Sequence, residues 1–306
     1  LAERVSRHGV LLLAAGPFSR TSAPAVSACL KAQVPYLDIT GEIGVFEAVF
    51  DRHAEAVKAG VVLLPGVGFD VVPSDCLAAS LAEALPGAVR LQLAFRGFGV
   101  SAGTARTMLE GLPKGGAARV DGKLVSVPAA WKTRTIPFSD RPRFAMTIPW
   151  GDLSTAYRST GIPNIETYMA MAPSHVSAVR WTRALLPLAG FGPLQALLAA
   201  WVKKGVAGPT AEERARERSL LWCRVEDGEG RAVEGTLETL EGYTLTAETA
   251  ALAAEKVLRG GVKPGAWTPS RAFGPRFIEK VRGTKLTVPS RSDGASPARK
   301  GGARQD

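Results

Sequence analysis

Glycines and carboxylates follow short apolar runs in the first 75 residues, where they could hold or act on a bound molecule. Gly66 and Gly68 come directly after such a run and shortly before Asp70. Glycine permits a positive φ and a close approach of the backbone, and open α/β sheets bind ligands at the carboxyl ends of their strands. Asp38 and Glu42 follow the preceding run and are, with Asp70, the acids nearest the same edge. These carboxylates fit a binding site, and they fit equally the capping of turns and helices.

Strand-loop-helix repeats would bring these residues to one edge of a sheet. Continuous apolar runs indicate buried strands, and each run is followed by a turn and a helical segment. Strands are expected at Val10–Ala15, Pro35–Thr40 and Val61–Leu64, and helices at about Ala23–Gln33, at Val45–Ala59 and from Pro73 onward. Such repeats predict a parallel sheet with crossover helices, and here they correspond to the back half of a nucleotide-binding domain.

From Arg90 onward the pattern changes to longer strands and hairpins. Strands are expected at Arg90–Phe98, Lys123–Val127, Arg134–Phe138, Phe144–Ile148, Glu166–Ala172, Leu220–Val225 and Ala232–Leu240, and a helix capped by Thr246 at Ala247–Leu258. The predicted fold class is α/β, with an incomplete Rossmann-like parallel sheet and a mixed α+β, largely antiparallel second domain. We expect boundaries at 1–89 for the nucleotide-binding half and 90–262 for a substrate and dimerisation domain. A segment at 263–288 would return to the nucleotide domain, and 289–306 would be a disordered basic tail.

The composition argues against several classes of protein. The chain has 306 residues, of which 46% are hydrophobic and 22% charged, as expected for a globular protein with two domains. Cys29, Cys76 and Cys223 are too scattered for a disulfide framework, and no C-x-x-C or H-x-x-x-H spacing suggests a metal site. The net charge of +10 is spread along the chain without a nucleic-acid-binding motif. We therefore expect a cytoplasmic protein with no metal and no nucleic-acid partner.

An ordered set of motifs resembles the saccharopine dehydrogenase-like oxidoreductases, and within them the trans-acting enoyl reductases. The motifs are A-A-G-P-F (14–18), Y-L-D-I-T-G-E (36–42), P-G-V-G-F-D-V-V-P-S-D (65–75), I-P-W-G-D-L-S-T-A-Y-R-S-T-G-I-P-N (148–164), G-Y-T-L-T-A-E-T-A (242–250) and P-G-A-W-T-P-S-R-A-F (264–273). The resemblance extends to about Val288. The family opens with a glycine-rich turn that holds the cofactor pyrophosphate, and this sequence has none, so we expect that roughly 60 to 80 residues before Leu1 are absent from it.

The resemblance implies reduction of a carbon-carbon double bond in a lipid or polyketide chain, with hydride from NADPH; the sequence leaves NAD open. The residues that the resemblance places beside this cofactor lie in the turns after the three strands, and they are Gly16, Pro17, Phe18, Asp38, Glu42, Gly66, Gly68, Phe69 and Asp70. Leu13 stands where family members commonly have a polar residue.

The proton for this reduction would come from the second domain. The candidates are Tyr157 and Tyr168, with Arg106 as an anion clamp. A tyrosine donates a proton more readily beside a cation, and Arg158 follows Tyr157. If the segment is a strand, however, adjacent residues point to opposite faces. A buried tyrosine bonded to the backbone is the plainer alternative for both.

The segment 184–202 contains no charged residue and is flanked by Arg180, Arg183, Lys203 and Lys204. It approaches the length of a membrane span, about 20 residues, but prolines and glycines interrupt it. It fits a subunit or domain interface, and it also fits a membrane-surface contact or a path for an acyl chain. The partners expected are therefore a lipid or polyketide acyl substrate, a second copy of the chain in a homodimer, and a membrane surface.

Two other functions stay open at the level of sequence. One is a non-catalytic, lipid-associated or scaffold protein that keeps the fold without a complete cofactor site. The other is an amino-acid dehydrogenase like saccharopine reductase, which would need clustered arginines to bind substrate carboxylates.

Overall fold

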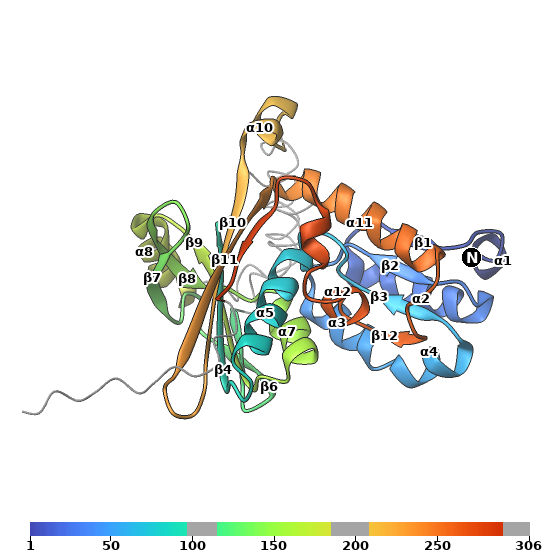
Figure 1. Ribbon diagram of the computed structural model, residues 1–306, viewed down its shortest axis with the longest axis horizontal. Helices are drawn as coiled ribbons and strands as arrows, with labels where there is room; N and C mark the ends of the chain where they lie inside the picture. The colour runs from blue at the N-terminus through green and yellow to red at the C-terminus, as the bar shows by residue number, and fades with distance from the viewer. Residues whose placement is uncertain (97–114, 185–207, 290–306) are drawn as a thin grey trace, which may run out of the picture.

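The computed structural model describes residues 1–96, 115–184 and 208–289, which form two sheets (Figure 1). The smaller sheet is parallel, in the order β1-β2-β3-β12. Its strands are β1 (Leu11–Leu13), β2 (Tyr36–Asp38), β3 (Val62–Leu64) and β12 (Gly265–Ala266). β2 and β3 are buried on both faces, which explains why β3 is a continuous apolar run.

The larger sheet is mixed and largely antiparallel, in the order β13-β11-β10-β4-β9-β5-β6, and β8 joins it beside β9 while pairing with β7. Its strands are β4 (Arg90–Arg96), β5 (Gly116–Val120), β6 (Lys123–Val127), β7 (Thr133–Pro137), β8 (Pro142–Thr147), β9 (Asn164–Ala170), β10 (Arg218–Glu226), β11 (Ala232–Leu240) and β13 (Lys285–Thr287). The predicted fold class is confirmed, and β6 and β11 have the predicted bounds. The end of the strand predicted at Arg90–Phe98 and residues 290–306 of the predicted tail lie outside the described residues.

Helices surround the small sheet and separate it from the large one. They are α1 (Ala2–Val5), α2 (Phe18–Ala32), α3 (Ile43–Phe50), α4 (His53–Ala59), α5 (Val72–Ala84), α7 (Asp152–Thr160), α8 (Pro173–Thr182), α10 (Ala211–Arg216), α11 (Gly242–Leu258), α12 (Pro269–Phe273) and the short 3-10 helix η3 (Phe277–Lys280). α5 and α7 pack together between the two sheets, whereas α8 lies with β7 and β8 on the far side of the large sheet (Figure 1).

Two predicted helices begin five residues too late, because their caps were not recognised. α2 starts at Phe18, since the Glu42 carboxylate accepts hydrogen bonds from the amides of Phe18 and Ser19 at 2.8 and 3.0 Å. α11 starts at Gly242, because Glu241 caps it by accepting from the amides of Tyr243 and Thr244. In both cases a carboxylate satisfies amides that a helix start leaves without partners.

One other expectation is wrong: Val45–Ala59 is not one helix but α3 and α4, which are separated at Asp51 and Arg52. The segment around Tyr157, for which no element was predicted, is the helix α7; Gly151 precedes it, and Gly161 ends it in the left-handed conformation, with φ 73°.

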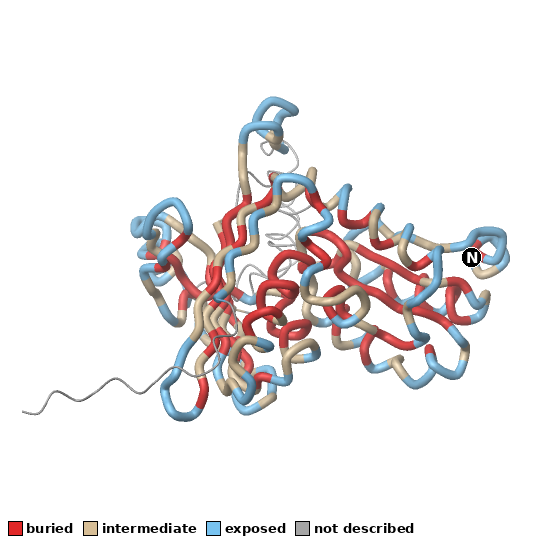
Figure 2. The backbone as a smooth tube through the Cα atoms, viewed as in Figure 1, coloured by how far each residue is buried: buried red, intermediate tan, exposed pale blue. Residues whose placement is uncertain are grey.

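One buried core connects the two sheets. Leu37 and Leu64 of the small sheet belong to the same cluster of buried side chains as Leu77 of α5 and Leu93 and Leu221 of the large sheet. Figure 2 shows buried backbone running from the small sheet through α5 into the large sheet. Packing of this kind fixes the position of the small-sheet loops relative to the large sheet.

A second connection between the two halves is ionic. Arg119 of β5 is 5% exposed, and it donates to Glu47 of α3 at 2.9 Å and to the carbonyls of Leu153 and Gly122 at 2.5 and 2.7 Å. Ser154 and Arg158 of α7 also donate to Glu47, at 2.6 and 3.2 Å. Burial pushes the pKa of Glu47 up, but these hydrogen bonds and the charge of Arg119 outweigh burial and hold the pKa below its ordinary value.

We expect Glu47→Ala to lower the free energy of unfolding by about 3 kcal/mol, because it leaves Arg119 buried without its anion. The matched control is Glu55→Ala on α4, which removes the more exposed ion pair with Arg52 and should cost much less. Urea unfolding followed by circular dichroism measures both. Equal losses in the two variants would show that the buried pair does not hold the halves together.

Candidate active site

The loops after β1, β2 and β3 meet at the carboxyl edge of the small sheet, and they contain the predicted cofactor-binding residues. Asp38 at the end of β2 is fully buried and ties two of these loops together. Its Oδ1 accepts from the amides of Gly66 and Thr40 at 2.8 and 3.0 Å, and its Oδ2 accepts from the hydroxyl of Tyr36 at 2.7 Å. Burial raises the pKa of Asp38 to about 6, although each of these bonds opposes that rise.

Glu42 joins the third loop to this edge. By capping α2 it fixes the turn Gly16-Pro17-Phe18 against the loop after β2. The positive end of a helix is a common place for a phosphate, but here a carboxylate of the chain itself lies there. In this structure Asp38 and Glu42 therefore act as capping residues that hold the loops.

The glycines after β3 are required by packing. Gly66 has φ 72°, and a Cβ on it would lie 2.7 Å from the ring of Phe46. A Cβ on Gly68 would lie 2.8 Å from Cγ2 of Thr246 on α11. Both glycines let neighbouring side chains of this protein approach closely.

Five backbone amides of the loop after β3 are already hydrogen-bonded within the chain. The amide of Gly66 donates to the Asp38 carboxylate, and that of Phe69 donates to the hydroxyl of Thr246 at 2.9 Å. Further bonds run from the amides of Val67, Val71 and Val72 to the carbonyls of Asp38, Gly66 and Gly68, respectively. With Glu42 on α2 as well, these bonds leave few amides of the described loops for the pyrophosphate of a dinucleotide, which needs several.

An aromatic wall lies where the loops meet the large sheet. Phe69 follows β3, Phe95 lies in β4, and Trp150 lies between β8 and α7. The ring centroids of Phe69 and Phe95 are 6.0 Å apart, and those of Phe95 and Trp150 are 4.6 Å apart. Phe95 is buried, whereas Phe69 and Trp150 are partly exposed. The wall offers an apolar surface to a flat or acyl ligand. Phe95 and Trp150 were not predicted, because nothing in their spacing indicates that they meet.

Asp70 differs from Asp38 and Glu42, because it does not cap any of the described loops or helices. Its side chain is partly exposed, yet its Oδ1 is buried and has no hydrogen-bond partner among the described residues. Its Oδ2 lies against Gly41, 2.5 Å from where a Cβ would be. Burial raises the pKa of Asp70 to about 7. A carboxyl group of this kind can hold a proton near neutral pH and give it up to a neighbour.

Further carboxylates lie near Asp70. Asp152, at the start of α7, is fully buried, and neither of its oxygens has a hydrogen-bond partner in the described part of the chain. Burial raises its pKa well above the ordinary value, and the nearby charges of Asp75 and Asp70 add to the rise. Asp75 is hydrogen-bonded by Ser159 and by the amide of Ser270. Among the described residues no three His, Cys, Asp or Glu side chains are placed to hold a metal ion.

The predicted proton donors do not meet at this edge. Tyr157 lies on α7 with its ring against the guanidinium of Arg119, 4.4 Å from the ring centroid. Tyr168 lies on the far face of the large sheet, in the cluster of Trp222 and Ile136, and its hydroxyl donates to Glu166. Burial raises the pKa of Tyr168, which makes it a poorer acid. Arg106 lies outside the described residues.

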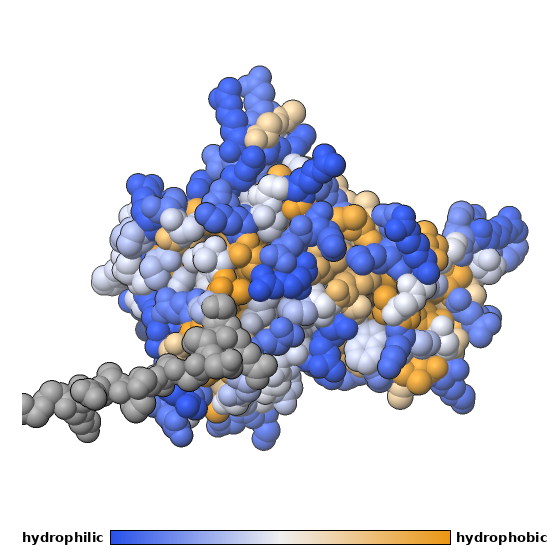
Figure 3. Space-filling model, viewed as in Figure 1, coloured by the Kyte–Doolittle hydropathy of each residue, from blue (hydrophilic) through white to orange (hydrophobic). Residues whose placement is uncertain are grey.

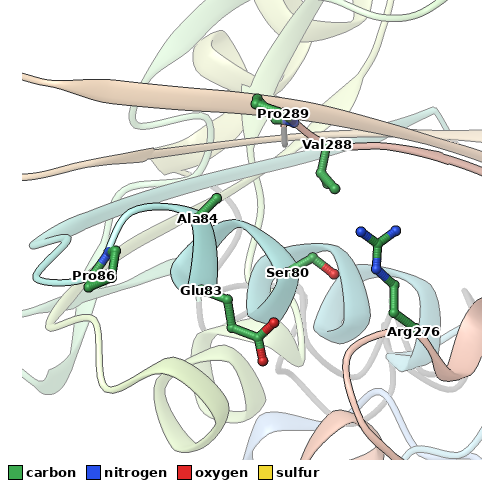
Figure 4. A pocket seen from close by; sticks show the side chains of 7 residues that line it. All are labelled: Ser80, Glu83, Ala84, Pro86, Arg276, Val288 and Pro289. Carbon is green, nitrogen blue, oxygen red and sulfur yellow. The ribbon is translucent and has the colours of Figure 1, made fainter. Parts of the chain in front are cut away.

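A surface hollow lies at the other end of α5 (Figure 4). It has a volume of about 460 Å³ and is lined by Ser80, Glu83, Ala84, Pro86, Arg276, Val288 and Pro289. The loops contact the first residue of α5, whereas the lining of the hollow begins at Ser80, so about 12 Å of helix separates the two. We therefore place the candidate site at the loops and the aromatic wall.

Comparison with known proteins supports the fold and part of the sequence. No family model matches the chain. Over 76 residues the chain is 38% identical to a trans-acting enoyl reductase of Mycobacterium ulcerans and 37% identical to one of Mycobacterium tuberculosis. Each match covers 24% of this chain, and the chain spans only 18% of the length of these relatives.

The similarity in structure is wider. Apo saccharopine dehydrogenase (L-Glu forming) from Saccharomyces cerevisiae superposes with a TM-score of 0.58 at 13% sequence identity, over 94% of this chain and 86% of that one. The chain therefore has a saccharopine dehydrogenase-like fold, and a part of it is distantly similar to trans-acting enoyl reductases.

Proposed function

We propose that this chain is an NAD(P)H-dependent oxidoreductase that reduces the carbon-carbon double bond of an enoyl group in a lipid or polyketide intermediate. The dehydrogenase fold supports the class of enzyme, and the 76-residue match to trans-acting enoyl reductases supports the type of substrate. Both agree with the position of the candidate site, at the carboxyl ends of parallel strands.

The observation that carries the proposal is a protonatable carboxyl group at the same edge as an apolar wall. Reduction of an enoyl group adds a hydride to one carbon and a proton to its neighbour. A nicotinamide cofactor, when bound, supplies the hydride. Asp70 supplies the proton, because its raised pKa keeps a fraction of it protonated near neutral pH. Phe69 and Trp150 hold the acyl chain and exclude water.

The described loops offer a cofactor few free amides. Those of Phe18, Ser19 and Gly66 are bonded to Glu42 and Asp38, so no phosphate contact is assigned to them. Their backbone can still pass beside a nicotinamide ring. NADPH is the proposed form, and the choice between NADPH and NADH depends on contacts that these loops do not make.

The occupied amides also favour a second candidate function. A protein that keeps the fold but binds no cofactor, as a lipid-associated or scaffold protein, would have loops that satisfy their own hydrogen bonds, as these do. An amino-acid dehydrogenase has less support, because Arg119 and Arg158 are committed to Glu47 and do not form a clamp for a substrate carboxylate.

We expect the chain to bind NADPH in a calorimetric titration and to oxidise it in the presence of a long-chain 2-enoyl thioester. Asp70→Asn should lower kcat by about a hundredfold or more while leaving the Kd for NADPH unchanged, because only proton transfer is lost. Asp51→Asn, at an exposed carboxylate, is the control. A folded chain that neither binds nor turns over would favour the scaffold function, and an Asp70→Asn variant with full kcat would remove Asp70 as the acid.

The raised pKa of Asp70 can also be tested by measuring protein stability at two pH values. Its pKa is raised in the folded state, so it stabilises the fold when protonated at low pH and loses this contribution as pH rises through about 7. Asn cannot ionise. We therefore compare the free energy of unfolding of Asp70→Asn with that of the wild type. The difference should shift in favour of the variant by about 1 to 3 kcal/mol from pH 5 to pH 8.5, a value reduced for solvent exposure. Urea unfolding at both pH values measures the difference, and a difference that does not change with pH contradicts the raised pKa.

A further inference from the structure

The end of α8 presents a tryptophan to solvent on the side of the large sheet away from the candidate site (Figure 1). Trp181 is 88% exposed, whereas most large hydrophobic side chains of the described part are buried. Arg180 and Arg183 flank it and are also exposed. With Ala184, these three residues line a hollow of about 500 Å³. This exposed indole, with an exposed arginine on either side in the sequence, is therefore available to a partner.

A second tryptophan and cation lie beside this one. Arg180 donates through Nε to the carbonyl of Ala130 at 3.2 Å, which places the end of α8 next to the connection between β6 and β7. Trp131 follows there, with the ammonium group of Lys132 4.2 Å from the centroid of its ring. We call Trp131, Lys132, Arg180, Trp181 and Arg183 the α8 corner.

Acidic residues are rare around the α8 corner. The sequence contains no Asp or Glu from Thr167 to Ala211, and none from Gly122 to Ser139. The neighbouring acids Glu166 and Asp140 are already paired, with Lys132 and Arg143. Glu166 thus neutralises Lys132, whereas Arg180 and Arg183 form no ion pair among the described residues, so the corner keeps a positive charge.

Tryptophan and arginine together are typical of proteins that lie on a lipid surface. Tryptophan is enriched at the boundary between lipid headgroups and acyl chains, where one part of its ring is wet and the rest is apolar. Each Lys or Arg near an anionic membrane contributes about 1 kcal/mol. No helix in the described ranges is both long and apolar enough to cross a bilayer.

We propose that the α8 corner docks the protein on an anionic lipid surface, with Trp181 inserted at the headgroup level and the arginines on lipid phosphates. The corner and the candidate site lie on opposite faces of the large sheet, so docking leaves the site free. This proposal is independent of the catalytic one, because it needs neither cofactor nor turnover.

The test is cosedimentation of the whole chain with vesicles. We expect binding to an equal mixture of phosphatidylcholine and phosphatidylglycerol, and little binding to phosphatidylcholine alone. Trp181→Ala should weaken binding about tenfold, and Arg183→Glu about thirtyfold, since a reversed charge changes the interaction by about two charges. Trp181 is exposed, so neither change should affect folding, which circular dichroism can verify.

Matched controls come from α11. Leu258 is 57% exposed, and Arg259 is exposed as well. Substituting them tests the same two kinds of change at a place away from the corner. Leu258→Ala and Arg259→Glu should leave vesicle binding within about twofold of the wild type.

The proposal is overturned if Trp181→Ala binds like the wild type, or if neutral and anionic vesicles bind equally. It is also overturned if Trp181→Ala changes the oligomeric state in sedimentation velocity without changing vesicle binding, since the corner would then be a contact between copies of the chain.

Discussion

Buried backbone amides have to be hydrogen-bonded, and at the carboxyl edge of the small sheet the chain supplies the acceptors itself. Asp38 bridges the loops after β2 and β3, and Glu42 caps α2. Because these two carboxylates fix the loops, the aromatic wall and Asp70 have defined positions beside them. The same bonds take the amides that a pyrophosphate would use. The rigidity of this edge and its poor fit to phosphate therefore have one cause.

The remaining features of the site depend on how the halves of the molecule meet. The shared core around Leu64 and Leu77 and the ion pair of Glu47 with Arg119 hold the large sheet against the loops. This contact brings Asp70 close enough to Asp152 to raise the pKa of Asp152. The apolar residues that reach the surface in Figure 3 lie largely beside α11 and the small sheet, away from α10. The candidate site thus lies where the two sheets meet, and contacts with both halves of the molecule fix its position.

Local patterns were enough to predict most strands, because a buried strand such as β3 is a continuous apolar run and β11 alternates. They were not enough for features set by distant residues. The cap of α2 comes from Glu42, 24 positions after Phe18, so the local pattern alone placed the start of this helix at about Ala23. The face of β9 that Tyr168 occupies depends on strand pairing, which residue types do not reveal. The position of Asp70 was predicted, but its protonation depends on burial that only the folded chain creates.

The late strands β12 and β13 give the fold a particular order of assembly. β12 pairs with β3, about 200 residues earlier in the chain, and β13 pairs with β11 of the other sheet. Neither sheet has its full set of described strands until this last segment has left the ribosome. Pairings between such distant residues close long loops and are slow to form. During synthesis β3 and β11 would therefore each have an unpaired edge for some time. Unpaired strand edges can associate with other chains.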